Sequence, residues 1–367
     1  MGQFCVPVKS IRKLAALGPD SEKSGFAMAW VLLALGGGVL WLIVLRGFWP
    51  SLDVLSPLGP HAFAGAAVAA VALMLTRGRT VFLMGSIGTI LLVPSLLSLD
   101  ALEHGGDRRL PWHDASLSQR DVLPQLRVLA INTWHSNGNL GELRSYIHGA
   151  DADVVVLSEF GPNKQAMLGS LKAAYPYQES CAAAWACSQV LLSRVPFARS
   201  GTRMPTPKTP PMVWAEFRVG SVDAAKLTVI GTHVFRPTRR HDLHKAQLEG
   251  LANIVRKTDG SVIVAGDFNM TRMSQSFDDF SYASGLVAPT RLLASWPAWP
   301  IPLPQFQLDY AFVSQDLQVL DQRLGHMIGS DHLPLWSAVR LPARSSVIAG
   351  QPQRQQTQSG NAASLVR

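Results

Sequence analysis

Three long apolar runs within the first hundred residues constrain the fold of this chain more than any other feature of its sequence. They cover residues 25–48, 61–76 and 81–99. A helix needs about 20 apolar residues to cross the hydrocarbon core of a bilayer, and the second run reaches that length only if it begins near Leu58. Buried core helices are the alternative, but soluble cores seldom contain three such runs in succession. The sequence therefore predicts a three-helix transmembrane anchor over residues 25–100.

The basic residues that flank these runs predict the orientation of the anchor. Lys and Arg are concentrated on the cytoplasmic side of membrane proteins. Residues 47–60 contain no Lys or Arg. The basic residues instead precede the first run or separate the second from the third: Lys9, Arg12, Lys13, Lys23, Arg77 and Arg79. Residues 1–24 are therefore predicted to be cytoplasmic, and the chain after Asp100 extracytoplasmic. In a bacterium with two membranes, this describes a multi-pass inner-membrane protein with a periplasmic domain. A cleavable signal peptide fits poorly, because the first run begins late and two more follow it.

The net charge and the cysteines constrain the function less. The net charge of +8 suits a phosphate-rich partner, but many of the basic residues lie beside the anchor and in the C-terminal tail. No CxxC pair is present, which argues against a zinc site built from thiolates. Cys181 and Cys187 lie close together in the sequence. An oxidising compartment would permit a disulfide between them, and two free cysteines are the alternative.

Residues 126–341 have the pattern of a separate α/β domain. Wholly apolar segments such as residues 261–265 predict strands that are buried on both faces, and residues 239–257 have the spacing of an amphipathic helix. Strands mixed with helices in this way indicate two packed sheets with helices outside them. Residues 101–125 show no period and are predicted to be a linker, and residues 342–367 are predicted to be a disordered tail.

Polar side chains lie at the ends of the apolar strands of this domain, and Asp309, Asp331 and His332 lie where later strands begin. Strand ends are rigid, so a site that is built there holds its side chains in fixed positions. Carboxylate and amide oxygens without thiolates suit a hard ion such as Mg²⁺ or Mn²⁺. The residues concerned are Asn132, Glu159, His233, Asp267, Asn269, Asp309, Asp331 and His332.

In their order and local sequence, these residues resemble the motifs of the endonuclease/exonuclease/phosphatase superfamily. The matching segments are GTH at 231–233, GDFN at 266–269, LDY at 308–310 and SDH at 330–332, together with Asn132 and Glu159. The resemblance covers residues 126–341. It implies a four-layer α/β sandwich of two packed mixed β-sheets flanked by helices, and a metal-dependent phosphoester hydrolase with Mg²⁺ or Mn²⁺ as cofactor.

The resemblance also implies which residues lie near the metal. Glu159 would be the principal metal ligand, with Asn132 and Asp331 close by. A divalent ion suits phosphoryl transfer, because it neutralises the negative charge that develops on the phosphoryl oxygens.

The other matching residues would act on water and phosphate. Asp267 would orient or deprotonate the attacking water, and Asn269 would hold the same water or the phosphate. His332 would act on the phosphoryl oxygens, oriented by Asp309. His233 would stabilise charge or protonate the leaving group. A carboxylate beside a histidine sets its tautomer and raises its pKa.

Each of these residues also has a purely structural interpretation. Asp267 and Asn269 fit an ordinary turn after a strand, and Glu159 could pair with a basic side chain. Asn132 could cap a turn, and Asp331 and His332 could cap the strand that follows them. A site is recognised by its complete set of roles, and here the full set occurs in order.

Several other residues are ambiguous in the sequence. His241 and His244 lie on the predicted helix without an HExxH motif, and we expect them to be solvated rather than to bind metal. His135 is a candidate for the wall of the site. The tryptophans of residues 295–304 could stack on a base, meet the lipid interface or pack within the loop. Arg236 and its neighbours Arg239 and Arg240 could contact phosphate or lie in solvent.

The sequence thus leaves three functional hypotheses. The first is a membrane-anchored phosphodiesterase or nuclease with an extracytoplasmic site. The second is a phosphatase or phospholipase-like enzyme that acts on lipid head groups. The third is a non-catalytic binding module, which the complete set of polar residues argues against. The signatures of abasic-site nucleases and of inositol phosphatases are incomplete. The expected partners are a phosphoester, either nucleic acid or a phospholipid head group, and the membrane; no obligate protein partner is evident.

Overall fold

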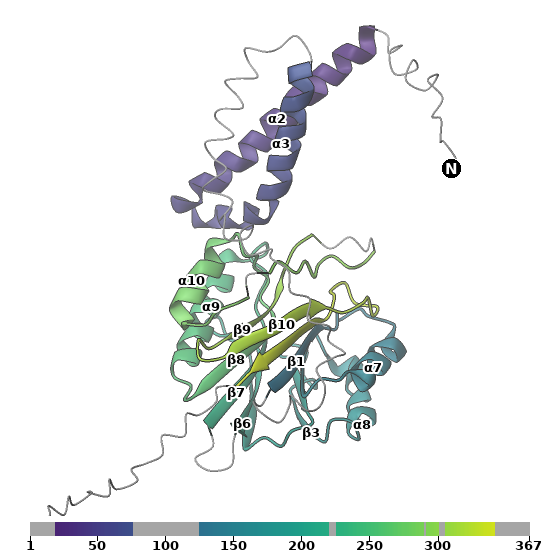
Figure 1. Ribbon diagram of the computed structural model, residues 1–367, viewed down its shortest axis with the longest axis vertical. Coiled ribbons are helices and arrows are strands. Elements are labelled where there is room, and N and C mark those ends of the chain that lie inside the picture. The colour runs from purple at the N-terminus through teal and green to yellow at the C-terminus, as the bar shows by residue number, and fades with distance from the viewer. Residues whose placement is uncertain (1–18, 76–124, 220–224, 290, 301–304, 342–367) are drawn as a thin grey trace, which may run out of the picture.

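A computed structural model describes residues 19–75, 125–219, 225–289, 291–300 and 305–341 of the chain (Figure 1). The third apolar run, most of the predicted linker and the predicted tail lie outside these residues.

The described N-terminal part is a helical hairpin that projects from the α/β domain. Helix α2 (Pro19–Val44) and helix α3 (Gly59–Leu75) lie side by side, joined by two 3₁₀ segments, η1 (Leu45–Gly47) and η2 (Pro50–Leu58) (Figure 1). Within the described residues, one helical stretch is long and apolar enough to cross a membrane, the 18 residues Trp30–Gly47. Helix α3 has 17 residues and falls just short of that length. Of the three predicted spans, the described structure therefore contains one that qualifies.

The α/β domain contains two mixed sheets, as predicted. The first has the strand order β10-β11-β1-β2-β4-β3 and the second β5-β6-β7-β8-β9. The strands of the first are β1 (Gln125–Asn132), β2 (Val154–Ser158), β3 (Tyr177–Ser180), β4 (Val190–Ser193), β10 (Gln318–Leu324) and β11 (Leu335–Arg340). Those of the second are β5 (Arg199–Arg203), β6 (Met212–Val219), β7 (Ala225–His233), β8 (Ser261–Asp267) and β9 (Asp309–Val313). Each sheet contains one parallel pair, β1 with β2 and β7 with β8.

Helices cover the outer faces of the two sheets and complete four layers. Helices α7 (Leu140–Gly149) and α8 (Met167–Leu171) pack on the first sheet, with the short η3 (Pro162–Lys164) before α8. Helices α9 (His241–Arg256) and α10 (Gln275–Ser284) pack on the second (Figure 1).

The alternation of side chains along β1 explains why its sequence is apolar without a break. Val128 and Ala130 point into the core between the two sheets, whereas Leu129 and Ile131 point into the core beneath α7 and α8. Both faces of the strand are buried, so both must be hydrophobic. The same applies to β2 and β8, and only the residues at their ends are free to be polar.

The register of the two parallel pairs brings those polar ends together. Asn132 lies opposite Ser158 at the ends of β1 and β2, and His233 lies opposite Asp267 at the ends of β7 and β8. Because the carboxyl ends of parallel strands lie at the same edge of a sheet, each sheet contributes one polar edge, and the packing of the sheets joins the two.

Candidate active site

Asn132 connects the two sheets at this edge. Its side-chain Nδ2 donates to Glu159 Oε1 at 3.2 Å and to Asp267 Oδ2 at 3.0 Å. All three side chains are buried, and the Asp267 side chain is fully so. The amide thus holds one carboxylate from each sheet in a fixed relative position.

Three residues of the site have backbones in the left-handed region. The φ angles are 52° for Trp134, 52° for Glu159 and 49° for Asn269. Residues other than glycine rarely adopt this conformation, and it persists only where surrounding contacts enforce it. For Asn269, its backbone N–H donates to Asp267 Oδ1 at 2.9 Å and its side-chain Nδ2 donates to the carbonyl of Val234 at 3.0 Å.

A buried lysine supports the other two left-handed residues. The Lys164 ammonium donates to the carbonyls of Trp134 at 2.9 Å, Glu159 at 3.2 Å and His135 at 3.4 Å. Burial is the main reason that the pKa of Lys164 falls to about 8, although the Glu159 carboxylate opposes the shift. Lys164 could not be singled out from the sequence, because lysine is almost never fully buried unless it is paired and nothing in its local sequence marks it.

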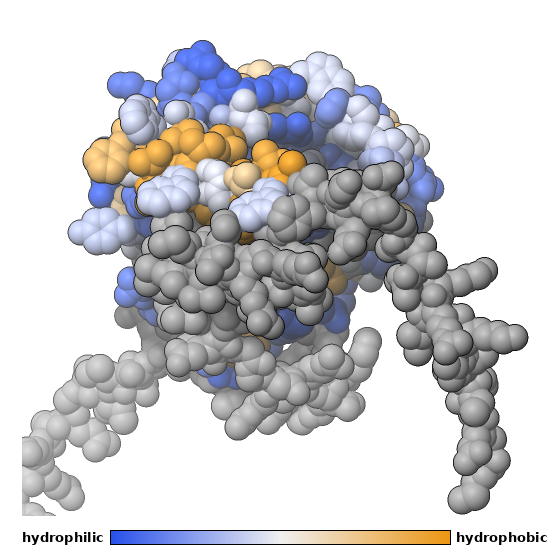
Figure 2. All heavy atoms as spheres, turned by 90° about the horizontal axis from the view of Figure 1, so that it is seen from above, coloured by the Kyte–Doolittle hydropathy of each residue, from blue (hydrophilic) through white to orange (hydrophobic). Residues whose placement is uncertain are grey.

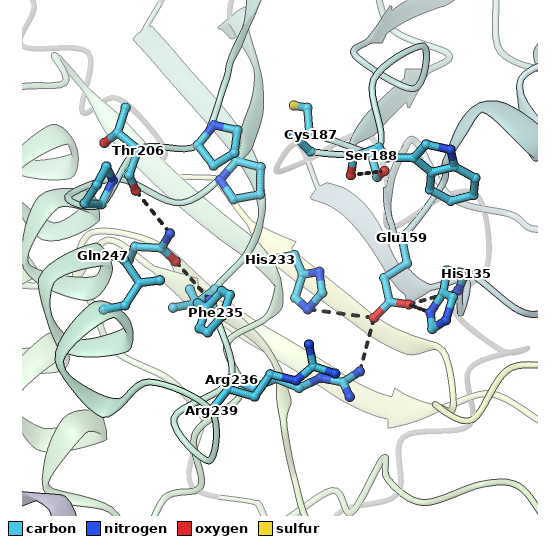
Figure 3. Close-up of a pocket in the computed structure, with 17 residues that line it drawn as sticks. His135, Glu159, Cys187, Ser188, Thr206, His233, Phe235, Arg236, Arg239 and Gln247 are labelled. Atoms are coloured by element: carbon cyan, nitrogen blue, oxygen red, sulfur yellow. Dashed lines mark hydrogen bonds and ion pairs between the residues drawn. The ribbon is translucent and has the colours of Figure 1, made fainter.

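The Glu159 carboxylate is surrounded by positive and donor groups (Figure 3). His135 contacts Oε2 through its backbone N–H and its ring Nδ1, both at 2.9 Å, while His233 Nε2 and an Arg236 nitrogen lie 3.8 and 3.5 Å from Oε1. Burial alone would raise the pKa of Glu159, but His233, His135 and Asn132 together lower it to about 2. The carboxylate is therefore ionised at any physiological pH.

His332 is held between two carboxylates of the second sheet. Its Nδ1 lies 2.7 Å from Asp309 Oδ2 and its Nε2 lies 3.7 Å from Asp267 Oδ2. Ser295 donates to the same Asp309 oxygen at 2.6 Å. Burial alone would lower the pKa of His332, but Asp309 and Asp267 raise it to about 10. Burial also raises the pKa of Asp267, despite the nearby histidines. His332 is therefore an imidazolium at neutral pH.

The structure thus brings six of the predicted residues into one connected cluster, which we call the strand-end cluster: Asn132, Glu159, His233, Asp267, Asp309 and His332.

Asn269 and Asp331 lie at the border of the strand-end cluster. Asn269 is anchored by its backbone to Asp267. Asp331 Oδ2 accepts a hydrogen bond of 3.4 Å from Trp296 Nε1, and its Oδ1 is buried with no hydrogen-bond partner. Burial raises the pKa of Asp331, and the Glu159 charge adds to this shift, so the two carboxylates interact.

A cavity of about 650 Å³ opens beside Glu159 and His233. Arg236 and Arg239 line it, as does His135, so these residues face the site rather than only solvent (Figure 3). The opposite wall includes the loop closed by the Cys181–Cys187 disulfide, which is present with a Cα–Cα distance of 5.8 Å. The sequence left open whether Arg236 and Arg239 lie only in solvent and whether Cys181 and Cys187 are paired, and the structure answers both questions.

The prediction for His244 is wrong. Its side chain is only 1% exposed, and its Nε2 lies 3.2 Å from the carbonyl of Phe268 within the GDFN segment. Burial lowers the pKa of His244 to about 4, so the ring is neutral at neutral pH and donates this hydrogen bond. The buried face of α9 includes Gln247, Leu248 and Leu251. Their spacing from position 244 is helical and was the signal that could have placed the histidine inside.

The tryptophans of the Pro- and Trp-rich loop take part in packing. The Trp299 ring lies 5.3 Å from that of Trp134, and Trp296 stacks on Phe306 at 6.0 Å. Trp299 remains half exposed beside the site.

Comparison with known protein families matches residues 129–332, more than half of the 367 residues, to the Endonuclease/Exonuclease/phosphatase family. The chain belongs to this family. It is accordingly a metal-dependent phosphoesterase, and the resemblance first seen in the motifs is confirmed. No curated protein matches the chain.

Several solved structures resemble it. A Staphylococcus aureus beta toxin variant with bound magnesium ions is 17% identical, with a TM-score of 0.44 over 58% of this chain and 99% of the toxin. Sphingomyelinase C from Streptomyces griseocarneus is 17% identical, with a TM-score of 0.44 over 59% and 99%. D. rerio TDP2 complexed with a single-strand DNA product is 17% identical, with a TM-score of 0.47 over 59% and 99%. The substrate has to be argued from the residues of this chain.

Proposed function

We propose that this protein is a membrane-anchored, divalent-metal-dependent phosphodiesterase whose active site lies outside the cytoplasm. The position of the Asp267 carboxylate carries the proposal. It accepts a hydrogen bond from Asn132 and lies 3.6 Å from His233 Nε2 and 3.7 Å from His332 Nε2. In such an arrangement, the carboxylate can accept a proton from the attacking water, and the imidazoles can stabilise the charge on the phosphate.

The roles follow from the bonds that change. Water adds to phosphorus, one P–O ester bond breaks, and the leaving oxygen takes up a proton, which gives a phosphomonoester and an alcohol. Asp267 orients the water and accepts its proton, and its raised pKa suits it to this task. The His332 imidazolium, fixed by Asp309, donates to a phosphoryl oxygen. His233 protonates the leaving oxygen or stabilises its charge, and Asn269 holds the water or the phosphate.

Glu159, Asn132 and Asp331 would hold Mg²⁺ or Mn²⁺. A bound divalent ion neutralises the charge that develops on the phosphoryl oxygens. The donors fit such an ion, because Glu159 is ionised and Asp331 Oδ1 is buried without a partner. In the described part of the chain, no three His, Cys, Asp or Glu side chains are grouped to enclose a metal. Water would complete the shell, as is usual for Mg²⁺.

The contact between the hairpin and the domain supports the extracytoplasmic location. If α2 and α3 both cross the membrane, the segment between them lies on the side opposite to residues 1–24. The domain contacts this segment, since Arg46 donates to the carbonyl of Met273 at 2.6 Å. The chain must then cross once more before Gln125, and residues 81–99 are sufficiently apolar by sequence. The disulfide agrees with an oxidising compartment.

The activity test uses the full chain in detergent with methyl 4-nitrophenyl phosphate as substrate. We expect hydrolysis with Mg²⁺ or Mn²⁺, none with EDTA, and a loss of at least about a thousandfold in Asp267→Asn and His332→Ala. Asp259→Asn and His148→Ala replace exposed residues remote from the site and serve as matched controls. Glu159→Gln should also abolish the rise in melting temperature that the metal produces. Full activity in Asp267→Asn would refute the assignment.

The location is tested separately by adding protease to intact spheroplasts. Digestion of the α/β domain from outside is the expected result, and protection that persists until the cells are lysed would place the domain in the cytoplasm.

A further inference from the structure

A second cavity, of about 450 Å³, lies between the hairpin and the α/β domain. We call it the hairpin cavity. Segment η2 forms one wall, and Asn269 and His332, to which the proposed function gives roles in catalysis, also line the cavity. Arg236 lines both this cavity and the larger one, so the two adjoin at this residue.

The hairpin is joined to the domain by specific polar contacts. The Asp53 carboxylate is 5% exposed and accepts hydrogen bonds from the backbone N–H of Gln275 at 2.8 Å and of Ser276 at 3.3 Å. These are free N–H groups in the first turn of α10, where a negative charge is also favoured by the helix dipole. Arg46 and Ser56 bind the same carboxylate within the hairpin. Segment η2 is therefore part of the wall of the site.

The lining of the hairpin cavity is mostly hydrophobic. Its apolar residues come from both walls: Leu55 and Leu58 from η2, and Met270, Trp296, Phe306 and Leu308 from the domain. Its size falls within the usual range for small-molecule sites, about 300–1,000 Å³. A polyanion would need basic side chains along its path, whereas Asp53 and Arg236 are the charged residues here apart from histidines. The cavity suits an uncharged apolar group attached to the phosphate.

With the hairpin embedded in a membrane, as proposed above, this cavity would lie near the membrane surface. Phe48 and Trp49, between η1 and η2, are 80% and 59% exposed. Trp and Tyr residues of membrane proteins gather where the bilayer meets water, and Trp49 fits this pattern. Seen from the end at which the hairpin projects, hydrophobic residues form a band beside hydrophilic ones (Figure 2). The phosphates of lipids lie at this same level.

We infer that the hairpin cavity binds the apolar portion of a membrane phospholipid whose phosphodiester is hydrolysed at the strand-end cluster. The inference rests on the proposed function. Water adds to phosphorus and one P–O ester bond breaks, so the products are a phosphomonoester and an alcohol, with no further reactant. Segment η2 is then a determinant of specificity.

The test fills the cavity and measures selectivity in the full chain. Leu55→Trp places an indole in the hairpin cavity. We expect it to lower, at least tenfold, the ratio of kcat/KM for dioleoyl phospholipids in mixed micelles to kcat/KM for methyl 4-nitrophenyl phosphate. The lipids are phosphatidylcholine, phosphatidylethanolamine and phosphatidylglycerol, assayed separately. Leu35→Trp is the matched control, since Leu35 is 63% exposed on α2 and lies away from the cavity, and it should leave the ratio unchanged.

Several outcomes would overturn the inference. An unchanged ratio in Leu55→Trp would do so, as would a wild-type preference for an oligonucleotide over every phospholipid. Leu58→Trp, at a more exposed position of the same wall, provides the same measurement if Leu55→Trp does not fold. If the wild-type chain hydrolyses the soluble diester but no lipid, only this inference fails. If it hydrolyses neither substrate with metal, the proposed function fails as well.

Discussion

The strand-end cluster and segment η2 both contribute residues to the wall of the hairpin cavity, but they are held in place in different ways. The cluster lies where two sheets meet, and its members are bound to one another and to backbone that the sheets fix, as in the bonds from Asn132 to Glu159 and Asp267. Segment η2 is connected to the domain through Asp53, and the adjoining η1 through Arg46, which bind residues more than 200 positions away in sequence. In the proposed function, the α/β domain therefore holds the residues that carry out the reaction, and the hairpin selects the substrate.

The largest effect of the four variants below is expected for Asp309→Asn. Without the carboxylate, His332 loses its fixed orientation and the partner that favours its charged form. We expect kcat to fall about a hundredfold with little change in KM, as for an acid that is no longer oriented and no longer held in its charged form. Ser295→Ala, which removes a lesser contact to the same carboxylate, should have a smaller effect. Equal effects of the two variants would contradict the role of Asp309.

Lys164→Met tests whether the cluster depends on the turns beneath it. The variant removes the ammonium that bridges three carbonyls, and Trp134 and His135 keep a second donor in Asn137 and Asn163, whereas the buried Glu159 carbonyl loses its donor. We expect the free energy of unfolding to fall by about 2 kcal/mol. Activity should fall about tenfold, because Glu159 is no longer held in its left-handed conformation. Urea unfolding and steady-state kinetics measure the two effects. Lys172→Met changes an exposed lysine and is the control. Unchanged stability would show that the turns need no such support.

Asp53→Ala tests the attachment of the hairpin. The bonds to the first turn of α10 are lost, and the wall of the hairpin cavity loosens. We expect hydrolysis of phospholipids to fall about threefold to fivefold relative to that of the soluble diester, which corresponds to roughly 1 kcal/mol. Asp279→Ala removes an exposed carboxylate of the same helix and should leave the ratio unchanged. A thousandfold loss on both substrates would abolish the distinction between the two regions.

The smallest effect on activity is expected from His244, which acts on stability as pH falls. The pKa of His244 is about 4 in the folded protein, whereas a histidine in the unfolded chain has a pKa of about 6.5. The unfolded chain therefore binds a proton at higher pH than the folded one. The contribution of the neutral His244 to the free energy of unfolding is fully present above pH 6.5 and is lost as the pH falls towards 4. The difference corresponds to about 3 kcal/mol. His244→Phe should remove this part of the pH dependence in urea unfolding, whereas His148→Phe should not.

The elements that surround the site were predictable because each is apolar on both faces and ends at a polar residue. Strands β1, β2 and β8 have this form, and the polar residues at their ends led directly to the family. Strands that could not be recognised in the sequence, such as β5, lie at sheet edges. One side of an edge strand faces solvent instead of another strand, so polar residues are tolerated there. Pattern reading has little to recognise there.

Other features could not be predicted, because they depend on contacts between distant segments. Nothing near Lys164 distinguishes it from a surface lysine, and its function becomes visible only once three carbonyls point at it. The same holds for Asp53, which the sequence placed in a loop of the anchor and the structure places at the first turn of α10. The number of membrane spans remains a sequence prediction beyond the one helix that qualifies by length and composition.

The position of the hairpin cavity beside Phe48 and Trp49 also determines how the enzyme would encounter its substrate. An enzyme anchored with its entrance at the bilayer surface searches in two dimensions. Its rate would then follow the mole fraction of the substrate among the surrounding lipids rather than the bulk concentration. Diluting the substrate with inert lipid in the same bilayer would slow the reaction, whereas diluting the vesicles in buffer would not.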